Sequence, residues 1–275
     1  MIRIEERDSW LLLEHDKHAA LAGEFARHWK NERFLPPEPF VHVLDAVSRH
    51  DDSWKEVDAN PNLTPEGNPS AFSSELVGTY DAFEEIDLED YLSVRGRATE
   101  KAAQRDSYAA VLISMHTVNL LTEQADLSQL NEEESRIHGD FIAGQLSRQK
   151  ELVEGLRETG FPEAALAEES FRLGFEFLQG CDSLSLLVGV DFSSPSQLRH
   201  AQRTRDGRKT EIGFEPKGKG IFQLDPYPFD EEGLAFCIPY ARVPKEATGS
   251  LGDFRRAYQS AERVSKEIFF FPKPS

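Results

Sequence analysis

The stretch VSRHDDSWKEVD, residues 47–58, puts a histidine and an aspartate at the end of an apolar helical pattern. The spacing of the preceding apolar residues predicts an amphipathic helix over about residues 38–50, with these positions facing inward: Phe40, Val43, Leu44 and Val47. His50 and Asp51 continue the same face, three and four residues beyond Val47. Because an unpaired charge is costly inside a protein, the pair either packs against polar partners or holds a ligand.

Three further polar residues continue the apolar faces of predicted helices: His18, His116 and Asp182. Asp182 is the most informative, because it lies in FEFLQGCDSLSLLVG, within the most hydrophobic helix of the chain. A divalent cation would supply the partner that an isolated carboxylate lacks there, and it can recruit ligands from separate helices. Mixed histidine and aspartate ligation suits Mn, Fe, Zn, Co or Ni.

These placements predict a metal site made of His18, His50, Asp51 and Asp182, with His116 as a further ligand or a substrate contact. The alternative is a buried hydrogen-bonded network without metal, in which each polar atom is satisfied by its neighbours. For His116 the corresponding alternative is a satisfied core histidine.

The rest of the chain predicts a mainly α fold in a single domain, residues 1–275. A helical body covers about residues 15–190, and short strand-like segments between turns form a β-rich appendage over about 191–275. The N-terminal IRIEERDSWLLLEH predicts two short strands around a turn at Arg7–Asp8. We expect a helical bundle with a small antiparallel sheet from the C-terminal region, which the N-terminal hairpin can join.

Composition narrows the classes of partner. A net charge of −18 argues against a nucleic-acid surface, because a phosphate backbone would be repelled. No run approaches the roughly 18–20 apolar residues that span a bilayer, and MIRIEERDSW lacks the pattern of a signal peptide. Two cysteines, Cys181 and Cys237, form no metal or redox spacing. We expect a cytoplasmic protein with a small-molecule substrate and neither nucleic-acid nor membrane partners.

The order of the polar residues resembles the HD-domain superfamily of metal-dependent phosphohydrolases. HAALAGEFA resembles its first-histidine helix, LDAVSRHDD its His-Asp helix and QGCDSLSLL its final-aspartate helix, over roughly residues 15–190. The resemblance implies an HD-like bundle in which His18, the His50–Asp51 pair and Asp182 bind the metal. The PYPF and CDSLSL features also resemble a bacterial family catalogued only as a domain of unknown function.

The HD resemblance implies that a metal-activated water hydrolyses a small phosphorylated metabolite or nucleotide. Asp52 or Glu56 would orient that water or protonate a leaving group, although Asp52 suits a local capping role equally well. Arg49 and Lys55 are candidate phosphate contacts. HD proteins often keep a lysine three residues after the aspartate, and here Trp54, a candidate pocket wall, takes that position.

Two other functions fit the same residues. Dinuclear HD members add two histidines between the pair and the last aspartate, and a di-iron oxygenase would need both His116 and His138. His138 lies on a charged helix where a solvated position is expected, so one metal ion is expected rather than two. The second alternative is a non-catalytic, metal-binding regulatory protein in which protein ligands fill every coordination position.

Overall fold

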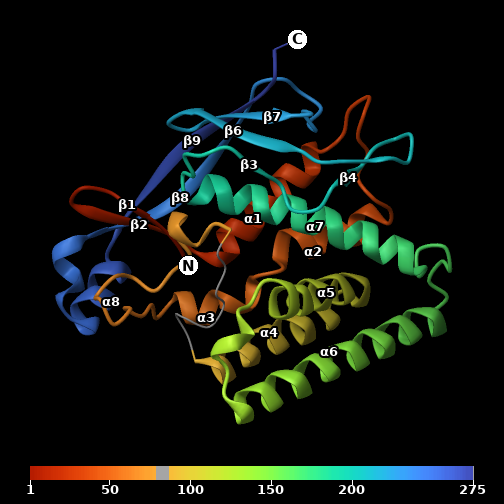
Figure 1. Ribbon diagram of the computed structural model, residues 1–275, viewed down its shortest axis with the longest axis horizontal. Coiled ribbons are helices and arrows are strands. Elements are labelled where there is room, and N and C mark those ends of the chain that lie inside the picture. Colours follow the sequence, from red (N-terminus) through yellow and green to blue (C-terminus); the bar gives the residue numbers. More distant parts are fainter. Residues whose placement is uncertain (79–86, 275) are drawn as a thin grey trace.

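The computed structural model describes residues 1–78 and 87–274 (Figure 1). The helices are α1 (His15–His28), α2 (Phe40–Arg49), α3 (Lys55–Asp58), α4 (Leu88–Ala103), α5 (Ser107–Glu123), α6 (Glu132–Glu158), α7 (Glu168–Gly189) and α8 (Leu251–Gln259). The strands are β1 (Ile2–Glu5), β2 (Ser9–Leu13), β3 (Ser196–Gln197), β4 (Gln202–Arg203), β5 (Lys209–Thr210), β6 (Gly213–Gly218), β7 (Ile221–Asp225), β8 (Leu234–Pro244) and β9 (Glu262–Pro272). Within these ranges no helix is long and apolar enough to cross a membrane.

Seven strands form one curled, mixed sheet in the order β1-β2-β8-β9-β7-β6-β3. The pairing of β7 with β9 is parallel, and the other pairings in the sheet are antiparallel. The N-terminal strand β2 pairs with β8, in a register that aligns Ser9 with Pro244 and Leu12 with Ala241. Strands β4 and β5 form a separate two-stranded hairpin.

The expectation of a mainly α bundle with a small antiparallel sheet is wrong. About half of the chain is helical, and the seven-stranded sheet is a major layer of the molecule (Figure 1). The sheet joins strands from opposite ends of the chain, and its longest strands, β8 and β9, have 11 residues each. Local periodicity predicts helices well, but it carries no signal for pairing between distant segments.

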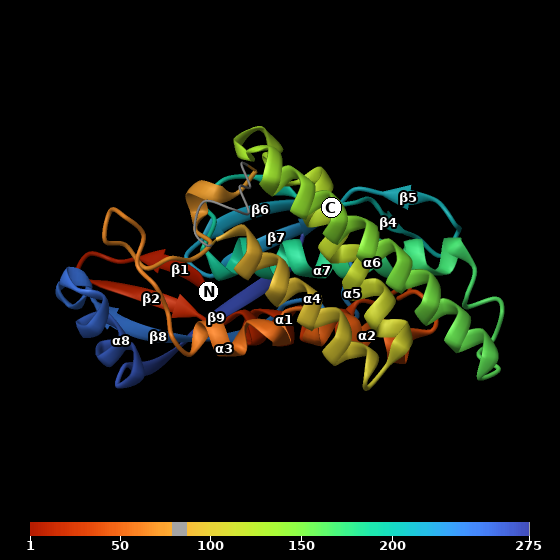
Figure 2. The same cartoon turned by 90° about the horizontal axis from the view of Figure 1, so that it is seen from below.

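A hydrophobic core connects the sheet to the helices beneath it. The ring of Phe25 on α1 lies 4.9 Å from that of Phe236 on β8 and 5.3 Å from that of Phe270 on β9, measured between centroids. Phe25 and Phe270 are fully buried, and burial of each such side chain contributes about 2–3 kcal/mol. Figure 2 shows α4, α5 and α6 on the side of the helical layer away from the sheet.

The helices that carry the candidate site cross at short distances. A Cβ atom at Gly23 on α1 would lie 2.1 Å from Ser48 Oγ on α2, so only glycine permits this approach. Helix α1 also packs along α7, and α5 packs against both α2 and α7. The interior of this four-helix arrangement is where the predicted metal ligands point.

Candidate metal centre

Four separate helical segments deliver five polar side chains to one buried place. His18 comes from α1, His50 and Asp51 from the end of α2, His116 from α5 and Asp182 from α7. Their ligand atoms form two groups in which all atoms lie within 4.8 Å of one another: His18, His50 and Asp51, and His50, His116 and Asp182. His50 belongs to both groups, so the structure brings all five candidate ligands together, each at most 5% exposed.

Carboxylate oxygens and imidazole nitrogens face one another at the centre of this cluster. The Oδ1 atom of Asp182 lies 2.9 Å from His18 Nε2 and 3.3 Å from His50 Nε2. The same His50 nitrogen lies 3.7 Å from Asp51 Oδ2. Two nitrogens and two carboxylates therefore converge on one small volume.

The outer contacts of the rings determine where their protons lie. His50 Nδ1–H donates to the carbonyl oxygen of Val47 at 2.9 Å, so Nε2 of the neutral ring carries no proton. Ser185 Oγ lies 2.9 Å from the carbonyl oxygen of Asp182 and 2.8 Å from His18 Nδ1. On the other side of the ring, His18 Nε2–H donates to Asp182 Oδ1 at 2.9 Å, because an ionised carboxylate only accepts. In the neutral His50 ring, by contrast, Nε2 presents a lone pair toward the carboxylates.

The neutral form of the cluster leaves one nitrogen, His50 Nε2, without a partner among the described residues. Within the described part of the chain, His50 Nε2 is buried and has no hydrogen-bond partner. A proton on His50 or a metal ion would satisfy it, and buried metal sites commonly hold histidine by this outer hydrogen bond to a carbonyl or hydroxyl group. The two imidazoles and two carboxylates fit a borderline divalent cation such as Zn, Mn, Fe, Co or Ni.

The electrostatics of the cluster agree with this arrangement. Burial by itself would lower the pKa of His50, but the Asp51 and Asp182 carboxylates outweigh burial and raise that pKa to about 9. Burial would raise the pKa of Asp182, yet its hydrogen bonds with His18 and His50 hold that pKa well below the usual range. The carboxylates are thus ionised and attract a cation.

Arg95 on α4 holds the second carboxylate in place. Its Nη1–H donates to Asp51 Oδ1 at 2.7 Å, and its Nε–H donates to the Tyr91 hydroxyl at 3.2 Å. The guanidinium also lies 5.3 Å from the ring centroid of Trp54. Burial would raise the pKa of Asp51, but Arg95 and His50 hold it well below its usual range. Asp51 therefore has one oxygen bound by Arg95 and one turned toward His50.

Sequence reasoning counted Arg95 only among the cations near the site along the chain that could contact a phosphate, and it did not predict the contact with Asp51. A signal was present, because Tyr91, Leu92, Arg95 and Ala98 follow one helical stripe of α4 and all are buried. An arginine on an apolar stripe needs an acidic partner inside the protein, just as Asp182 needs a cation.

His116 and His138 differ from the ligands above. Gln179 Nε2–H donates to His116 Nδ1 at 2.7 Å, which leaves the proton of the neutral ring on Nε2. Burial lowers the pKa of His116 to about 3, against the opposing effect of Asp182, so the ring is neutral near pH 7. His138 is 7% exposed rather than solvated, and its Nε2 lies 3.0 Å from the carbonyl oxygen of Leu121, outside both ligand groups.

The predicted catalytic and substrate-binding residues lie outside these two groups. Asp52 forms ion pairs with Lys55 at 3.0 Å and Arg49 at 3.5 Å, and all three line an open groove along α1 and α2. Glu56 is exposed and lies 3.3 Å from Lys101. Trp54 is buried between His15, Tyr91 and Arg95. The catalytic and substrate roles of these residues stay predictions.

Comparison with known proteins identifies one family. Residues 1–245 match the family described as "Protein of unknown function (DUF3891)", which confirms the resemblance to a domain family of unknown function. No curated protein and no solved structure matches the chain. Membership of the HD-domain superfamily stays a prediction.

Proposed function

We propose that this chain, which belongs to the DUF3891 family, binds one divalent metal ion through His18, His50, Asp51 and Asp182 and hydrolyses a phosphoric ester of a small metabolite or nucleotide. One observation carries the metal assignment: two imidazoles and two carboxylates converge in a buried volume, and among the described residues His50 Nε2 finds no hydrogen-bond partner there. The reaction class comes from the likeness of the ligand order to HD-domain phosphohydrolases, which is an analogy between folds.

Each residue of the cluster has a distinct task in this proposal. Val47 fixes the tautomer of His50, so that its Nε2 is available as a ligand. Ser185 Oγ lies beside His18 Nδ1 and would accept its proton when His18 Nε2 binds the metal. Arg95 holds one oxygen of Asp51 and aims the other at the site. A bound divalent cation supplies Lewis acidity, which lowers the pKa of a water molecule and neutralises charge on a phosphoryl oxygen.

His116 is suited to hold a hydrogen bond rather than to move a proton. Its ring stays neutral because burial lowers its pKa to about 3. With Gln179 bound at Nδ1, the Nε2–H group is a donor for a substrate oxygen. If the Gln179 amide is turned by 180°, the carbonyl oxygen binds Nδ1–H and Nε2 becomes a further ligand.

A specific observation favours a second candidate, a non-catalytic metal-binding regulatory protein. The five side chains are between 0 and 5% exposed, which is typical of a metal site closed to solvent. A di-iron oxygenase has less support, because His138 lies outside both groups of possible ligands.

Metal content and turnover separate these functions. Purified protein should contain about one equivalent of a divalent metal by elemental analysis, and Asp182→Asn should lose it. Asp140→Asn, which removes an exposed aspartate of α6, is the matched control and should retain the metal. The metal-loaded protein should hydrolyse members of a broad panel of phosphoric esters, and Asp182→Asn should not.

Two results would contradict the proposal. Metal without turnover across the panel would favour the regulatory protein. Absence of metal after loading with each candidate ion would leave the cluster as a hydrogen-bonded network that carries a proton on His50.

A further inference from the structure

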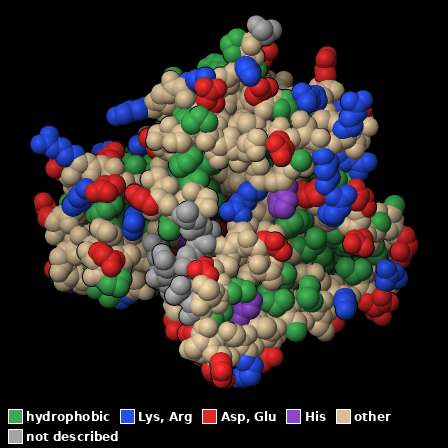
Figure 3. Space-filling model, viewed as in Figure 1, with side chains coloured by type: hydrophobic (Ala, Val, Ile, Leu, Met, Phe, Trp, Pro, Cys, Tyr) green, Lys and Arg blue, Asp and Glu red, His purple; other side chains and the backbone are tan. Residues whose placement is uncertain are grey.

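A cationic hollow lies beside the β4–β5 hairpin, away from the metal ligands. It has a volume of about 660 Å³ between the hairpin and the segment 32–33. Four cations line it, Arg33, Arg205, Arg208 and Lys209, against two carboxylates, Glu32 and Asp206. Figure 3 shows Lys and Arg side chains gathered over the region of β4 in Figure 1. In a chain with a net charge of −18, this local excess of cations needs an explanation.

Two of these guanidinium groups have no acidic partner. In residues 1–78 and 87–274, neither Arg33 nor Arg205 has a carboxylate within 4.0 Å, whereas Arg208 pairs with Asp206 and Lys209 with Glu176. Arg205 Nε–H donates to the carbonyl oxygen of Asn31, and Arg33 NH2 lies 3.3 Å from Thr210 Oγ1.

The two arginines are held next to each other by the backbone. The N–H group of Arg205 donates to the carbonyl oxygen of Arg33 at 2.9 Å, and Phe34 pairs with Thr204 as an isolated bridge. Their exposed side chains line the same hollow, so one anion there can contact both guanidinium groups. The planar guanidinium presents N–H donors that match the oxygens of a phosphate group.

A pocket with an apolar part continues from this hollow. It has a volume of about 320 Å³ and shares Thr204 and Arg205 with the cationic hollow. Its other lining residues include six with apolar side chains, Trp29, Leu35, Pro36, Pro37, Leu173 and Phe177, and three charged ones, Glu38, Glu176 and Arg203. Leu35 is 48% exposed, so part of this apolar surface faces solvent. A ligand with an apolar body attached to an anion would occupy both compartments.

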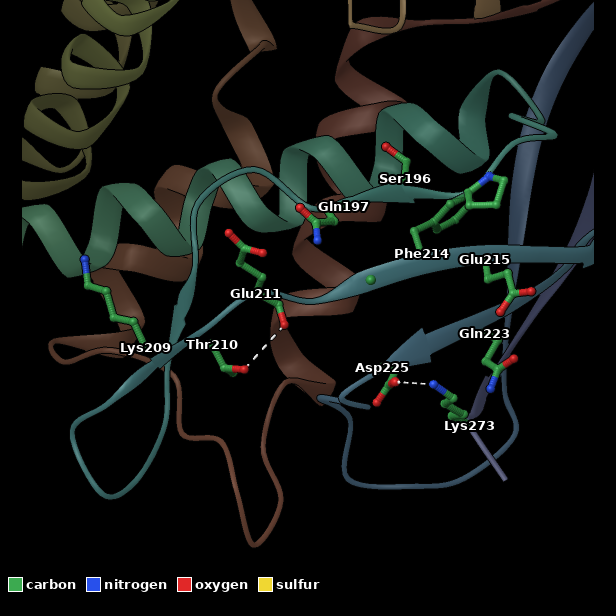
Figure 4. A pocket seen from close by; sticks show the side chains of 12 residues that line it. Ser196, Gln197, Lys209, Thr210, Glu211, Phe214, Glu215, Gln223, Asp225 and Lys273 are labelled. Atoms are coloured by element: carbon green, nitrogen blue, oxygen red, sulfur yellow. Dashed lines mark hydrogen bonds and ion pairs between the residues drawn. The ribbon is translucent and has the colours of Figure 1, made fainter. Parts of the chain in front are cut away.

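A second hollow, which shares Lys209 and Thr210 with the first, suits an anion less well. Figure 4 shows Lys209, Thr210 and Glu211 toward one end of it and Glu215 and Asp225 toward the other, so its lining has three carboxylates and two lysines. Lys273 pairs with Asp225 at 3.1 Å, which leaves a lining of mixed charge. The chemistry of the two hollows therefore directs an anion to Arg33 and Arg205.

We propose that the joined pockets bind an organic phosphate, with the phosphate between Arg33 and Arg205 and an apolar body against Trp29, Leu35 and Phe177. Arg208 and Lys209 add positive charge at the rim of the cationic compartment. None of the residues that line either pocket is a candidate metal ligand, so this site is separate from the metal centre.

Three probes test the two compartments. 1-Naphthylmethylphosphonate carries both an anion and an apolar body and cannot be hydrolysed as an ester. Methylphosphonate carries the anion alone, and 1-naphthylmethanol carries the body alone. Isothermal titration calorimetry on the full chain should give the tightest binding for the first probe and weaker affinity at higher ionic strength.

Variants locate the binding. Arg33→Gln and Arg205→Gln should each weaken 1-naphthylmethylphosphonate binding about tenfold, because each removes a charged hydrogen bond to the phosphonate. Arg33→Lys with Arg205→Lys should restore part of the affinity, and circular dichroism checks folding. Arg97→Gln is the matched control, since Arg97 is exposed and donates to Ser93 Oγ, and it should bind as the unaltered chain does.

Binding of 1-naphthylmethylphosphonate should not depend on the metal centre. Asp182→Asn should leave the affinity for 1-naphthylmethylphosphonate unchanged. Loss of binding in Asp182→Asn with retention in the Arg33/Arg205 variants would place the phosphonate at the metal centre and overturn the inference. Equal affinity for 1-naphthylmethanol, or no binding of 1-naphthylmethylphosphonate at millimolar concentration, would also overturn it.

Discussion

Two buried histidine–aspartate clusters lie one turn apart along α1, and they differ in how their carboxylates are satisfied. Asp58 lies 2.6 Å from the backbone N–H of His15, 3.0 Å from His15 Nδ1 and 3.1 Å from the Met1 amino group, so donors surround it. Asp182 lies 2.9 Å from His18 Nε2 and 3.3 Å from His50 Nε2, and the neutral His50 ring carries its proton on the outer nitrogen, Nδ1.

The comparison separates a structural role from a binding role. Both carboxylates are at most 5% exposed, and burial would raise the pKa of each. His15 and the amino group hold the pKa of Asp58 well below its usual range, so that cluster is complete within the protein. The cluster around Asp182 needs a cation from outside or a proton on His50. The two clusters thus share residue types and burial. They differ in the hydrogen-bond donors that the protein supplies, and this difference decides between a structural role and a binding role.

The largest expected effect is on metal affinity. Asp182→Asn should weaken binding of the preferred divalent metal by more than about a hundredfold. Mutation of a residue that only hydrogen-bonds to a metal ligand already weakens metal affinity by about tenfold to a hundredfold, and Asp182 is itself a proposed ligand. Asp58→Asn should leave metal affinity unchanged. Competition with a fluorescent chelator measures both, and equal losses in the two variants would remove the distinction between the clusters.

The free energy of unfolding should depend more on Asp58 than on Asp182. Asp58→Asn should lower the free energy of unfolding by about 3 kcal/mol, because it leaves buried donors without their charged partner. The folded-state pKa of Asp58 is depressed, so its stabilising contribution is present above about pH 4 and is lost as the pH falls further. Urea unfolding between pH 7 and pH 3 checks both points. A steeper loss of stability in acid for Asp58→Asn than for the unaltered chain would contradict the assignment.

Metal binding should depend on pH through His50. Its pKa is raised to about 9 in the metal-free protein, so a metal ion must displace a proton below that pH. Apparent affinity should rise about tenfold per pH unit below about pH 9 and level off above it. Calorimetry in buffers of different ionisation enthalpy should detect about one released proton near pH 7. Metal binding to Asp58→Asn should release the same number of protons. If it released none, protonation of the cluster around Asp182 would depend on the cluster around Asp58.

The smallest expected effect concerns Arg95. Arg95→Met should weaken metal binding about tenfold, because Asp51 loses the donor that orients its carboxylate. Arg95→Lys should recover part of this loss, since it retains a positive charge but not the contact with the Tyr91 hydroxyl. Unchanged metal affinity in Arg95→Met would show that Asp51 is oriented without it.

Helical periodicity predicted the inward-facing polar residues of the cluster better than it predicted the fold, for a physical reason. His18, His50, Asp51, His116 and Asp182 were predicted to face inward and are buried, because a polar residue on an apolar helical stripe is visible from neighbours three or four positions away. Arg95 follows the same rule on α4, but its burial against Asp51 was not predicted. His138 was expected on the surface, because its helix is charged, but it packs against α5 through the carbonyl oxygen of Leu121.

The amino-acid sequence by itself determined which helices have an inward face and which ionisable residues lie on it, because helical periodicity is a local property. The tertiary structure alone decided in which register β2 pairs with β8, that Arg95 meets Asp51 and that, among the described residues, Asp58 is satisfied while His50 Nε2 is not. Each of these contacts joins segments far apart in the chain. Their pairing depends on the packing of the whole molecule, and no short stretch of sequence encodes it.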